Sequence, residues 1–268
     1  MSSSPTSAGA RDMAVSIQPL DVADIPACAR LSAAAFATDP HTIVKQLGRQ
    51  SYDMFAIARS GLEENLKRQN FVCVKAVDDQ GIIVGHASWV FSGGGQKRAS
   101  SRDTGDGESA PTPADKATEP DSRPQAHGDD AEEEGDPIER LHALEEADTQ
   151  YWLQNLVPVD TPCMFVVGLA VLPSHEGRGI GRALLRHGNA IADERRLSIW
   201  VHSSHQAYVA YSKAGFETRR ELNINLDDYA PRPPRDGEAT MAVAGQDNDD
   251  GRWGQYIIRY MERKPGGN

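Results

Sequence analysis

Cysteine is scarce in this 268-residue sequence, which contains only Cys28, Cys73 and Cys163. An odd number of cysteines in apolar or helical contexts predicts buried free thiols rather than a disulfide framework. The sequence also lacks an apolar run long enough to cross a bilayer, and its first dozen residues lack the apolar core of a signal peptide. These absences predict a soluble protein of a reducing compartment, the cytoplasm or the nucleus, without a membrane partner.

Two signatures of phosphate and nucleic-acid binding are missing as well. No Gly-Lys-Ser or Gly-Lys-Thr triplet occurs, which excludes the P-loop of nucleoside triphosphatases. No basic stripe with interleaved aromatic residues occurs either, which argues against a nucleic-acid partner. The sequence offers no pattern of metal ligands, so we expect no metal.

Basic residues are fewer than acidic ones: the chain has 28 Lys and Arg against 39 Asp and Glu, a formal net charge of -11. Residues 92–136 hold 12 acids and 5 Lys or Arg, and residues 227–250 hold 7 acids and 2 Arg. Taking both segments away leaves a net charge of +1. The acidity therefore belongs to insertions, and it does not exclude an anionic ligand for the folded core.

Hydrophobic periodicity predicts one mixed α/β domain over residues 13–265, preceded by a disordered segment 1–12. Poor in apolar residues and rich in Gly, Ser, Pro and acids, residues 92–136 are predicted to be a disordered insertion, and residues 227–250 an acidic loop. Apart from the helix at 137–156, which precedes the strand after the hairpin, the predicted order is strand, two helices, hairpin, strand, helix, strand, helix, strand. Strands are expected at 14–18, 71–77, 82–91, from Met164 to the stop at Pro173, at 197–201 and at 253–261, with an extended return that begins at Phe216. Helices are expected between Leu20 and Thr38, over 40–69, over 137–156, after the glycine turn along Ile180, Leu184 and Ile191, and over 203–214. Gly85 is a candidate bulge.

The most informative stretch is Met164–Gly181, which begins as an apolar strand and stops at Pro173. Three glycines, Gly177, Gly179 and Gly181, then lead into a helical pattern. A turn almost without side chains lets backbone N–H groups and the positive helix N-terminus face one anion, for which phosphate is the natural candidate.

The glycine spacing separates this turn from a dinucleotide-binding unit. That unit needs Gly-x-Gly-x-x-Gly and an acidic residue about 20 positions later, at the end of the next strand. Here the next strand, Leu197–Val201, ends in His202-Ser203-Ser204 and offers no carboxylate for a ribose. This argues against a dinucleotide site, as the missing Gly-Lys-Ser/Thr argues against a nucleoside triphosphate site.

These residues resemble the GCN5-related N-acetyltransferase (GNAT) family, whose signature is a strand L-x-V-x-P followed by Q/R-x-x-G-x-G/A and a helix. Leu169, Val171, Pro173, Gly179 and Gly181 match it. A second family element, a small polar residue followed by A-x-x-x-Y-x-x-x-G-F, is matched by Ser204, Ala207, Tyr211, Gly215 and Phe216. The chain departs at Glu176, where the family has Gln or Arg, and at Ser204, where many members have Asn.

The resemblance implies an acyl-CoA N-acyltransferase fold: a central, mostly antiparallel sheet with two splayed strands, flanked by helices. It also implies acetyl-CoA as co-substrate, with its pyrophosphate on the turn and its pantetheine arm in the gap beside Leu169–Val171. The residues that it assigns to cofactor binding are Leu169, Ala170, Val171, Glu176, Gly177, Arg178, Gly179, Ile180, Gly181, Arg182 and Ser204.

The implied reaction is direct attack of an amine on the thioester in a ternary complex. A backbone N–H near Leu169 or Ala170 would stabilise the oxyanion, and Tyr211 occupies the position of the family's general acid. His202, His205, His86 or a water chain are the candidates for the base. Cys163 lacks an evident partner, which disfavours a covalent enzyme intermediate.

The acceptor, a small-molecule or peptide amine, is left open by the sequence. In this family it is selected by segments outside the shared motifs, here 39–70, the helix after Asp136 and the region after Leu222. The competing hypothesis is a sensor or scaffold that binds acyl-CoA without catalysis, in which Tyr211 would be dispensable. Either function is compatible with a monomer or a homodimer.

Overall fold

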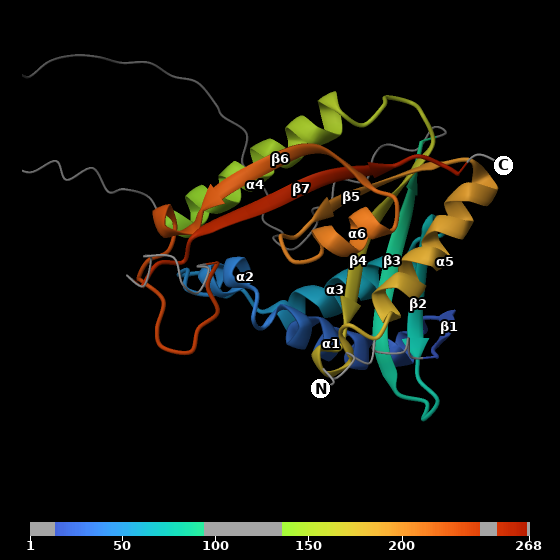
Figure 1. Cartoon of the computed structure of the whole chain (residues 1–268), viewed down its shortest axis with the longest axis horizontal. Helices are drawn as coiled ribbons and strands as arrows, with labels where there is room; N and C mark the ends of the chain where they lie inside the picture. The colour runs from blue at the N-terminus through green and yellow to red at the C-terminus, as the bar shows by residue number, and fades with distance from the viewer. Residues whose placement is uncertain (1–13, 94–135, 242–250, 267–268) are drawn as a thin grey trace, which may run out of the picture.

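The protein folds around one seven-stranded sheet, seen in a computed structural model that describes residues 14–93, 136–241 and 251–266. The strand order is β1-β2-β3-β4-β5-β7-β6 (Figure 1). All neighbouring strands are antiparallel except β4 and β5, which are parallel. The strands are β1 (Ser16–Pro19), β2 (Phe71–Val77), β3 (Ile83–Ser92), β4 (Cys163–Val171), β5 (Ser198–Ser203), β6 (Glu217–Asn225) and β7 (Gln255–Arg263). The predicted fold class is confirmed.

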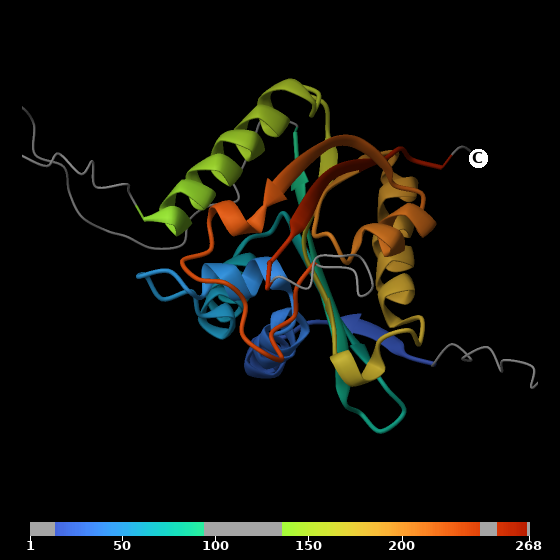
Figure 2. The same ribbon diagram turned by 60° about the vertical axis from the view of Figure 1, so that its left-hand side comes forward.

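Helices cover both faces of the sheet. Helices α1 (Ile25–Phe36), α2 (Pro40–Lys45), α3 (Met54–Lys67) and α4 (Pro137–Asn155) lie on one side, and α5 (Ile180–Arg195) and α6 (Tyr208–Lys213) on the other (Figure 2). We call these two sides the α4 face and the α5 face. Short 3-10 turns, Val22–Asp24, Pro173–His175 and Leu226–Asp228, complete the connections.

Aspartate side chains start three of the helices on the α4 face. Asp39, Asp53 and Asp136 each accept a hydrogen bond from a backbone N–H of the helix that follows. Such caps satisfy amides that have no partner inside the helix. Asp136 with Pro137 at the first helical position confirms the start predicted for α4.

The long helix predicted over residues 40–69 is wrong, because the segment forms α2 and α3 with a non-helical connection at 46–53. Gly48 lies in this connection, where an added Cβ would lie 3.1 Å from the Ile138 side chain. Asp53 then caps a new helix through Phe55 and Ala56. The apolar stripe had the correct period on both sides, but it carries no information about the interruption.

Two large apolar cores lie on the two faces. The core of the α5 face includes Trp89, Met164, Leu184, Val201 and Phe216. The core of the α4 face is rich in aromatic residues and includes Trp152, Trp200, Trp253, Tyr256 and Tyr260. Neighbouring residues of β5 alternate between the two cores, as expected for a strand buried on both sides.

β4 and β5 separate after four paired residues. The pairs run from Cys163↔Ser198 to Val166↔Val201, and beyond them β4 continues to Val171 beside β3 alone. A bulge accompanies the separation: Val166 pairs with Trp89 and Gly168 with Ser88, so Val167 is left without a β3 partner. The edge of β4 that faces β5 is therefore open from Val167 to Val171.

The remaining predictions about the fold have mixed outcomes. The bulge expected at Gly85 lies beside it, since Ala76 pairs with Gly85 and Val77 with Ile83. Cys28, Cys73 and Cys163 form no disulfide, as predicted; Cys28 and Cys163 are buried, whereas Cys73 is only half-buried. Ser92 ends β3, while the disorder predicted at 1–12, across most of 92–136 and in the later part of 227–250 lies outside the described residues. None of the helices in the described segments is long and apolar enough to cross a membrane.

Candidate active site

The turn between β4 and α5 has the geometry of an anion site. Gly177 and Gly179 adopt positive φ angles of 72° and 82°, which only glycine adopts without strain. Gly179 is the N-cap of the 16-residue helix α5, and no side chain caps this helix end. Its N-terminal amides and its positive dipole end are thus available to a negatively charged group.

The side chains around this turn leave its backbone accessible to a ligand. Glu176, Gly177, Arg178 and Arg182 are exposed, whereas the Ile180 side chain is buried in the core. Ile180 would therefore contact a ligand only through its backbone. Gly181 has space around it, since an added Cβ would meet only Val171 Cγ2, at 3.7 Å.

The open edge of β4 leads directly into this turn. Leu169 and Val171 are half-buried and Ala170 is buried, and all three pair with β3 on one side only. An extended ligand lying in the gap between β4 and β5 would find unpaired backbone groups along Val167–Val171. The predicted cofactor-binding residues of β4 and of the turn thus form one continuous surface.

Tyr211 lies on the α5 face of this gap. It comes from α6, is 5% exposed and packs edge-to-face on Phe216 with ring centroids 5.3 Å apart. Gly215 ends the helix with a φ of 90°, which confirms the predicted end of this element. Burial raises the pKa of Tyr211, so the phenol stays protonated at neutral pH.

His202 follows the last paired residue of β5, Val201. Because Val201 belongs to the core of the α5 face, His202 projects to the α4 face. There its ring stacks on Tyr260 at a centroid distance of 5.2 Å. The structure thus places the predicted acid and this candidate base on opposite faces of the sheet.

The surroundings of His202 favour its neutral form. Loss of water around the ring lowers the pKa of His202, the charge of Glu145 opposes this change, and the charges of His41 and Lys45 support it. The residue itself remains exposed. Solvent contact limits the size of the shift, but its direction keeps the imidazole neutral near pH 7 and able to accept a proton.

The other candidate bases have structural partners. His205 Nδ1 accepts a hydrogen bond from the Ile257 backbone N–H at 3.1 Å, so this nitrogen is occupied. His86 lies opposite Ala170 in the sheet but is only 4% exposed, with Nε2 2.8 Å from Ser32 Oγ of α1. Burial lowers the pKa of His86 to about 4. These contacts favour His202 over both.

Ser204 has a local role in the connection from β5 to α6. Its Oγ accepts a hydrogen bond from the Ala207 backbone N–H at 3.3 Å. This contact holds the chain that brings α6, and with it Tyr211, beside the gap. A small hydroxyl is sufficient for this, although many GNAT members carry Asn here.

The structure adds a polar cluster that the sequence analysis missed. It surrounds Glu145 of α4, whose carboxylate is bonded by His41 and Lys45 of α2. Burial raises the pKa of Glu145, but the hydrogen bond from His41 and the charges of His41 and Lys45 outweigh it and lower the pKa to about 2. The charges of all three residues reach His202.

One sequence signal could have revealed this cluster. The buried positions of α4 are Ile138, Leu141, Glu145, Asp148 and Trp152, spaced by three and four residues. Two of the five are acids on the apolar stripe of the helix. Buried carboxylates need partners, so this pattern alone predicts cations or donors on the facing elements.

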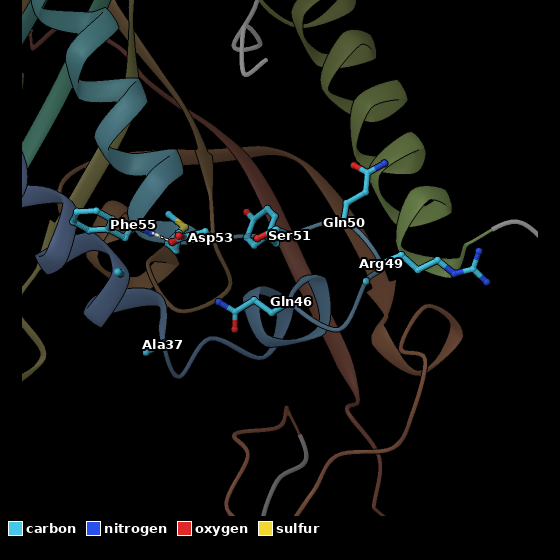
Figure 3. Close-up of a pocket in the computed structure, with 11 residues that line it drawn as sticks. Ala37, Gln46, Arg49, Gln50, Ser51, Asp53 and Phe55 are labelled. Carbon is cyan, nitrogen blue, oxygen red and sulfur yellow. Dashed lines mark hydrogen bonds between the residues drawn. The ribbon is translucent and has the colours of Figure 1, made fainter. Parts of the chain in front are cut away.

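A separate hollow of about 600 Å³ lies between the end of α1 and the connection from α2 to α3 (Figure 3). Its lining includes Ala37, Gln46, Ser51 and Phe55, and it takes no residue from β4, β5, α5 or α6. In Figure 3 the side chains of Arg49 and Gln50 point away from its centre. This hollow belongs to the α4 face and is not the cofactor gap.

Fold and site together combine three features. Two parallel strands separate, a glycine turn precedes an uncapped helix N-terminus, and Tyr211 is buried on the next helix. Within the described segments, no group of three or more His, Cys, Asp or Glu is arranged to hold a metal ion.

Comparison with known proteins finds similarity to one acetyltransferase family. Residues 131–218, from before α4 into β6, match the family model of the acetyltransferase (GNAT) domain. The matched stretch makes up 88 of the 268 residues of the chain. The arylalkylamine N-acetyltransferase 2 of Aedes aegypti has a similar structure, with a TM-score of 0.55 and 14% identity, covering 94% of this chain and 99% of that one. This likeness supports the fold alone.

Two curated relatives share sequence over part of their length. The mycothiol acetyltransferase of Streptomyces coelicolor is 36% identical over 110 residues, which are 38% of this chain and 33% of that protein. The mycothiol acetyltransferase of Streptomyces scabiei is 32% identical over 108 residues, with the same coverage of both. The chain spans about one third of the length of these relatives.

Proposed function

We propose that this protein is an acetyl-CoA-dependent N-acetyltransferase in which an amine attacks the thioester directly, in a ternary complex. The observation that carries the proposal is the separation of β4 from β5 beyond Val166, which leads straight to the uncapped N-terminus of α5. The open strand edge suits an extended thiol arm, and the helix end suits a pyrophosphate. The matched GNAT family model supports the same assignment.

The residues present fit this cofactor. The backbone N–H groups from Gly177 to Gly181 would hold the pyrophosphate, with Arg178 and Arg182 adding positive charge near it. Glu176, the departure from the family pattern, is exposed, so its carboxylate has room to turn toward solvent. Leu169, Ala170 and Val171 would pair with the arm through their backbone.

Proton transfers are divided between the two faces of the sheet. His202 would take one proton from the acceptor ammonium on the α4 face, and the resulting amine forms a new C–N bond with the acetyl carbonyl carbon. A backbone N–H near Leu169 or Ala170 would stabilise the oxyanion. When the C–S bond breaks, Tyr211 would give its proton to the leaving thiolate on the α5 face. The second proton of the attacking nitrogen would leave to water, which leaves a neutral amide, and Tyr211 would regain a proton from water.

The test is a screen of acceptors with release of the CoA thiol as the readout. Purified protein is incubated with acetyl-CoA and a panel of small amines, polyamines, lysine peptides and peptides with free N-termini. Wild type is compared with Tyr211→Phe and with the matched control Tyr208→Phe, the same change on the same helix. We expect turnover of at least one amine, lost in Tyr211→Phe and retained in Tyr208→Phe.

The same screen decides against the competing function. A protein that binds acetyl-CoA in titration calorimetry but acetylates none of the amines would be a sensor or scaffold. Equal turnover in wild type and Tyr211→Phe would remove Tyr211 from the mechanism. Loss of binding at millimolar acetyl-CoA and CoA would contradict both functions.

A further inference from the structure

The cluster around Glu145 has an internal order that the proposed mechanism does not use. His41 Nε2 bonds Oε1 of the carboxylate, and Lys45 Nζ lies 2.5 Å from Oε2. The three side chains are only 10–13% exposed. An ionised carboxylate accepts hydrogen bonds and does not donate them, so His41 Nε2 must carry the hydrogen. In the neutral ring Nδ1 is then the nitrogen that can take up a proton.

The segment that carries His41 is fixed on both sides of the ring. Asp39 accepts hydrogen bonds from Thr42, through the backbone N–H at 2.9 Å and Oγ1 at 2.8 Å, and from Tyr256 OH at 3.1 Å. The His41 ring stacks on Tyr256 with centroids 4.8 Å apart and an angle of 20°. His41 is thus held in one orientation by α4 and β7 together.

The cluster lies within electrostatic reach of His202. Glu145, His41 and Lys45 each act on the charge of His202, which stacks on Tyr260 of the same strand that carries Tyr256. Further ionisable groups face this region, each from a neighbouring element and most of them paired. They are Asp39 with Tyr256, Asp148 of α4 with Arg220 of β6, Tyr260 of β7, and His205 after β5, whose Nδ1 is bonded to Ile257.

We propose that Glu145 is a positioning residue that makes the α4 face the proton-accepting side of the active site. It fixes the tautomer of His41, and its charge stabilises the imidazolium that forms when His202 takes the proton of the acceptor ammonium. The proton then leaves to water from the exposed His202. This inference rests on the proposed function, since it assigns a partner to the base of that reaction.

Two substitutions of opposite sign test the inference. Glu145→Gln keeps the shape but removes the negative charge, so the pKa of His202 should fall by about one unit, the usual size of the effect of one neighbouring charge. Lys45→Met removes the opposing positive charge, so the pKa of His202 should rise. Glu139→Gln, which changes an exposed acid on the first turn of α4, should leave it unchanged.

The measurement is an NMR titration of the imidazole rings in the full chain without cofactor or acceptor. His41→Gln and His202→Gln assign the two resonances. An unchanged pKa of His202 in Glu145→Gln, or shifts of the same direction in Glu145→Gln and Lys45→Met, would overturn the inference. If Glu145→Gln does not fold, Lys45→Met alone decides, because a missing upward shift is then sufficient to reject it.

The titration also separates this inference from the proposed function. Shifts of the expected sign without turnover of any amine would leave the cluster in place and reject the acetyltransferase activity. Turnover without such shifts would support the acetyltransferase activity and reject the role of the cluster. With turnover, the acidic limb of kcat/KM should move to lower pH in Glu145→Gln and to higher pH in Lys45→Met, which a purely structural role of Glu145 does not produce.

Discussion

The close approach of α5 to the sheet gives a sharp stability prediction at Gly188. This glycine is buried in α5 and faces Trp89, which is 1% exposed. A Cβ at position 188 would lie 2.5 Å from Trp89 Cζ2 and 2.6 Å from Nε1. Carbon atoms in contact normally lie about 3.5–4.0 Å apart, so helix and ring must separate by about 1 Å.

The expected cost of Gly188→Ala follows from two opposing effects. Overpacking of a closed core costs about 1–3 kcal/mol or more, and alanine recovers about 1 kcal/mol of helix propensity. Because no flexible side chain can move aside, we expect a cost of about 3 kcal/mol, at the upper end of this range, and a net loss of stability of about 2 kcal/mol. In a domain of this size that corresponds to a fall in Tm of about 4–8 °C.

Gly61→Ala is the matched control. Gly61 is in the interior of α3, and an added Cβ would meet no atom within 4 Å. Only the gain in helix propensity remains, so we expect the free energy of unfolding to increase by about 0.5–1 kcal/mol and Tm to rise by about 1–4 °C. Both are measured by thermal and urea unfolding. A Gly188→Ala variant as stable as Gly61→Ala would refute the packing of α5 on Trp89.

Three further predictions concern the turn and two histidines. Gly179→Ala forces alanine to a φ of 82°, a strain of about 1–2 kcal/mol, so acetyl-CoA affinity measured by calorimetry should fall about tenfold or the turn should rearrange. His202→Gln should lower kcat by about 10²-fold and abolish the acidic limb of the pH profile. Because the pKa of His202 is lowered from its ordinary value, this limb should lie below pH 6.5 in the wild type. Burial lowers the pKa of His86 from 6.5 to about 4, so the folded protein prefers the neutral ring. The free energy of unfolding should therefore fall by up to about 3 kcal/mol as the pH falls from 6.5 to 4. In urea unfolding, the stability of His86→Gln should depend less on pH in this range.

The sequence predicted the parts of the site that depend on local chemistry. Glycines at 177 and 179 are required by positive φ angles, and Gly215 by the end of α6, so the turn and the tyrosine helix can be inferred from residue types. The order of strands and helices follows from hydrophobic period and turn residues. The splaying of β4 from β5 came from the family resemblance rather than from the residues of either strand.

The remainder depends on contacts between distant segments. Glu145 and Lys45 are 100 residues apart, and Tyr256 and Asp39 are 217 residues apart. No local pattern specifies which of the acids on α4 meets which cation of α2, because tertiary packing decides that pairing. The break between α2 and α3 is of the same kind, since it contains Gly48, where an added Cβ would lie only 3.1 Å from the Ile138 side chain of α4.

The ranking of the candidate bases also needed the structure. From the sequence, His202, His205 and His86 were equivalent polar residues near a strand. The alternation of β5 sends His202 to the α4 face, a backbone amide occupies His205, and α1 closes over His86. Only a three-dimensional arrangement distinguishes an accessible imidazole from two that are already bonded.

Hydrogen exchange of the full chain with and without acetyl-CoA tests the central claim most directly. If acetyl-CoA lies in the gap with its pyrophosphate on α5, the amides of 167–171 and 177–182 should exchange more slowly when it is present. The amides of the hollow at 46–55 should not change. Protection confined to 46–55, or none at 167–171 and 177–182 under saturating acetyl-CoA, would contradict the assignment of the cofactor site.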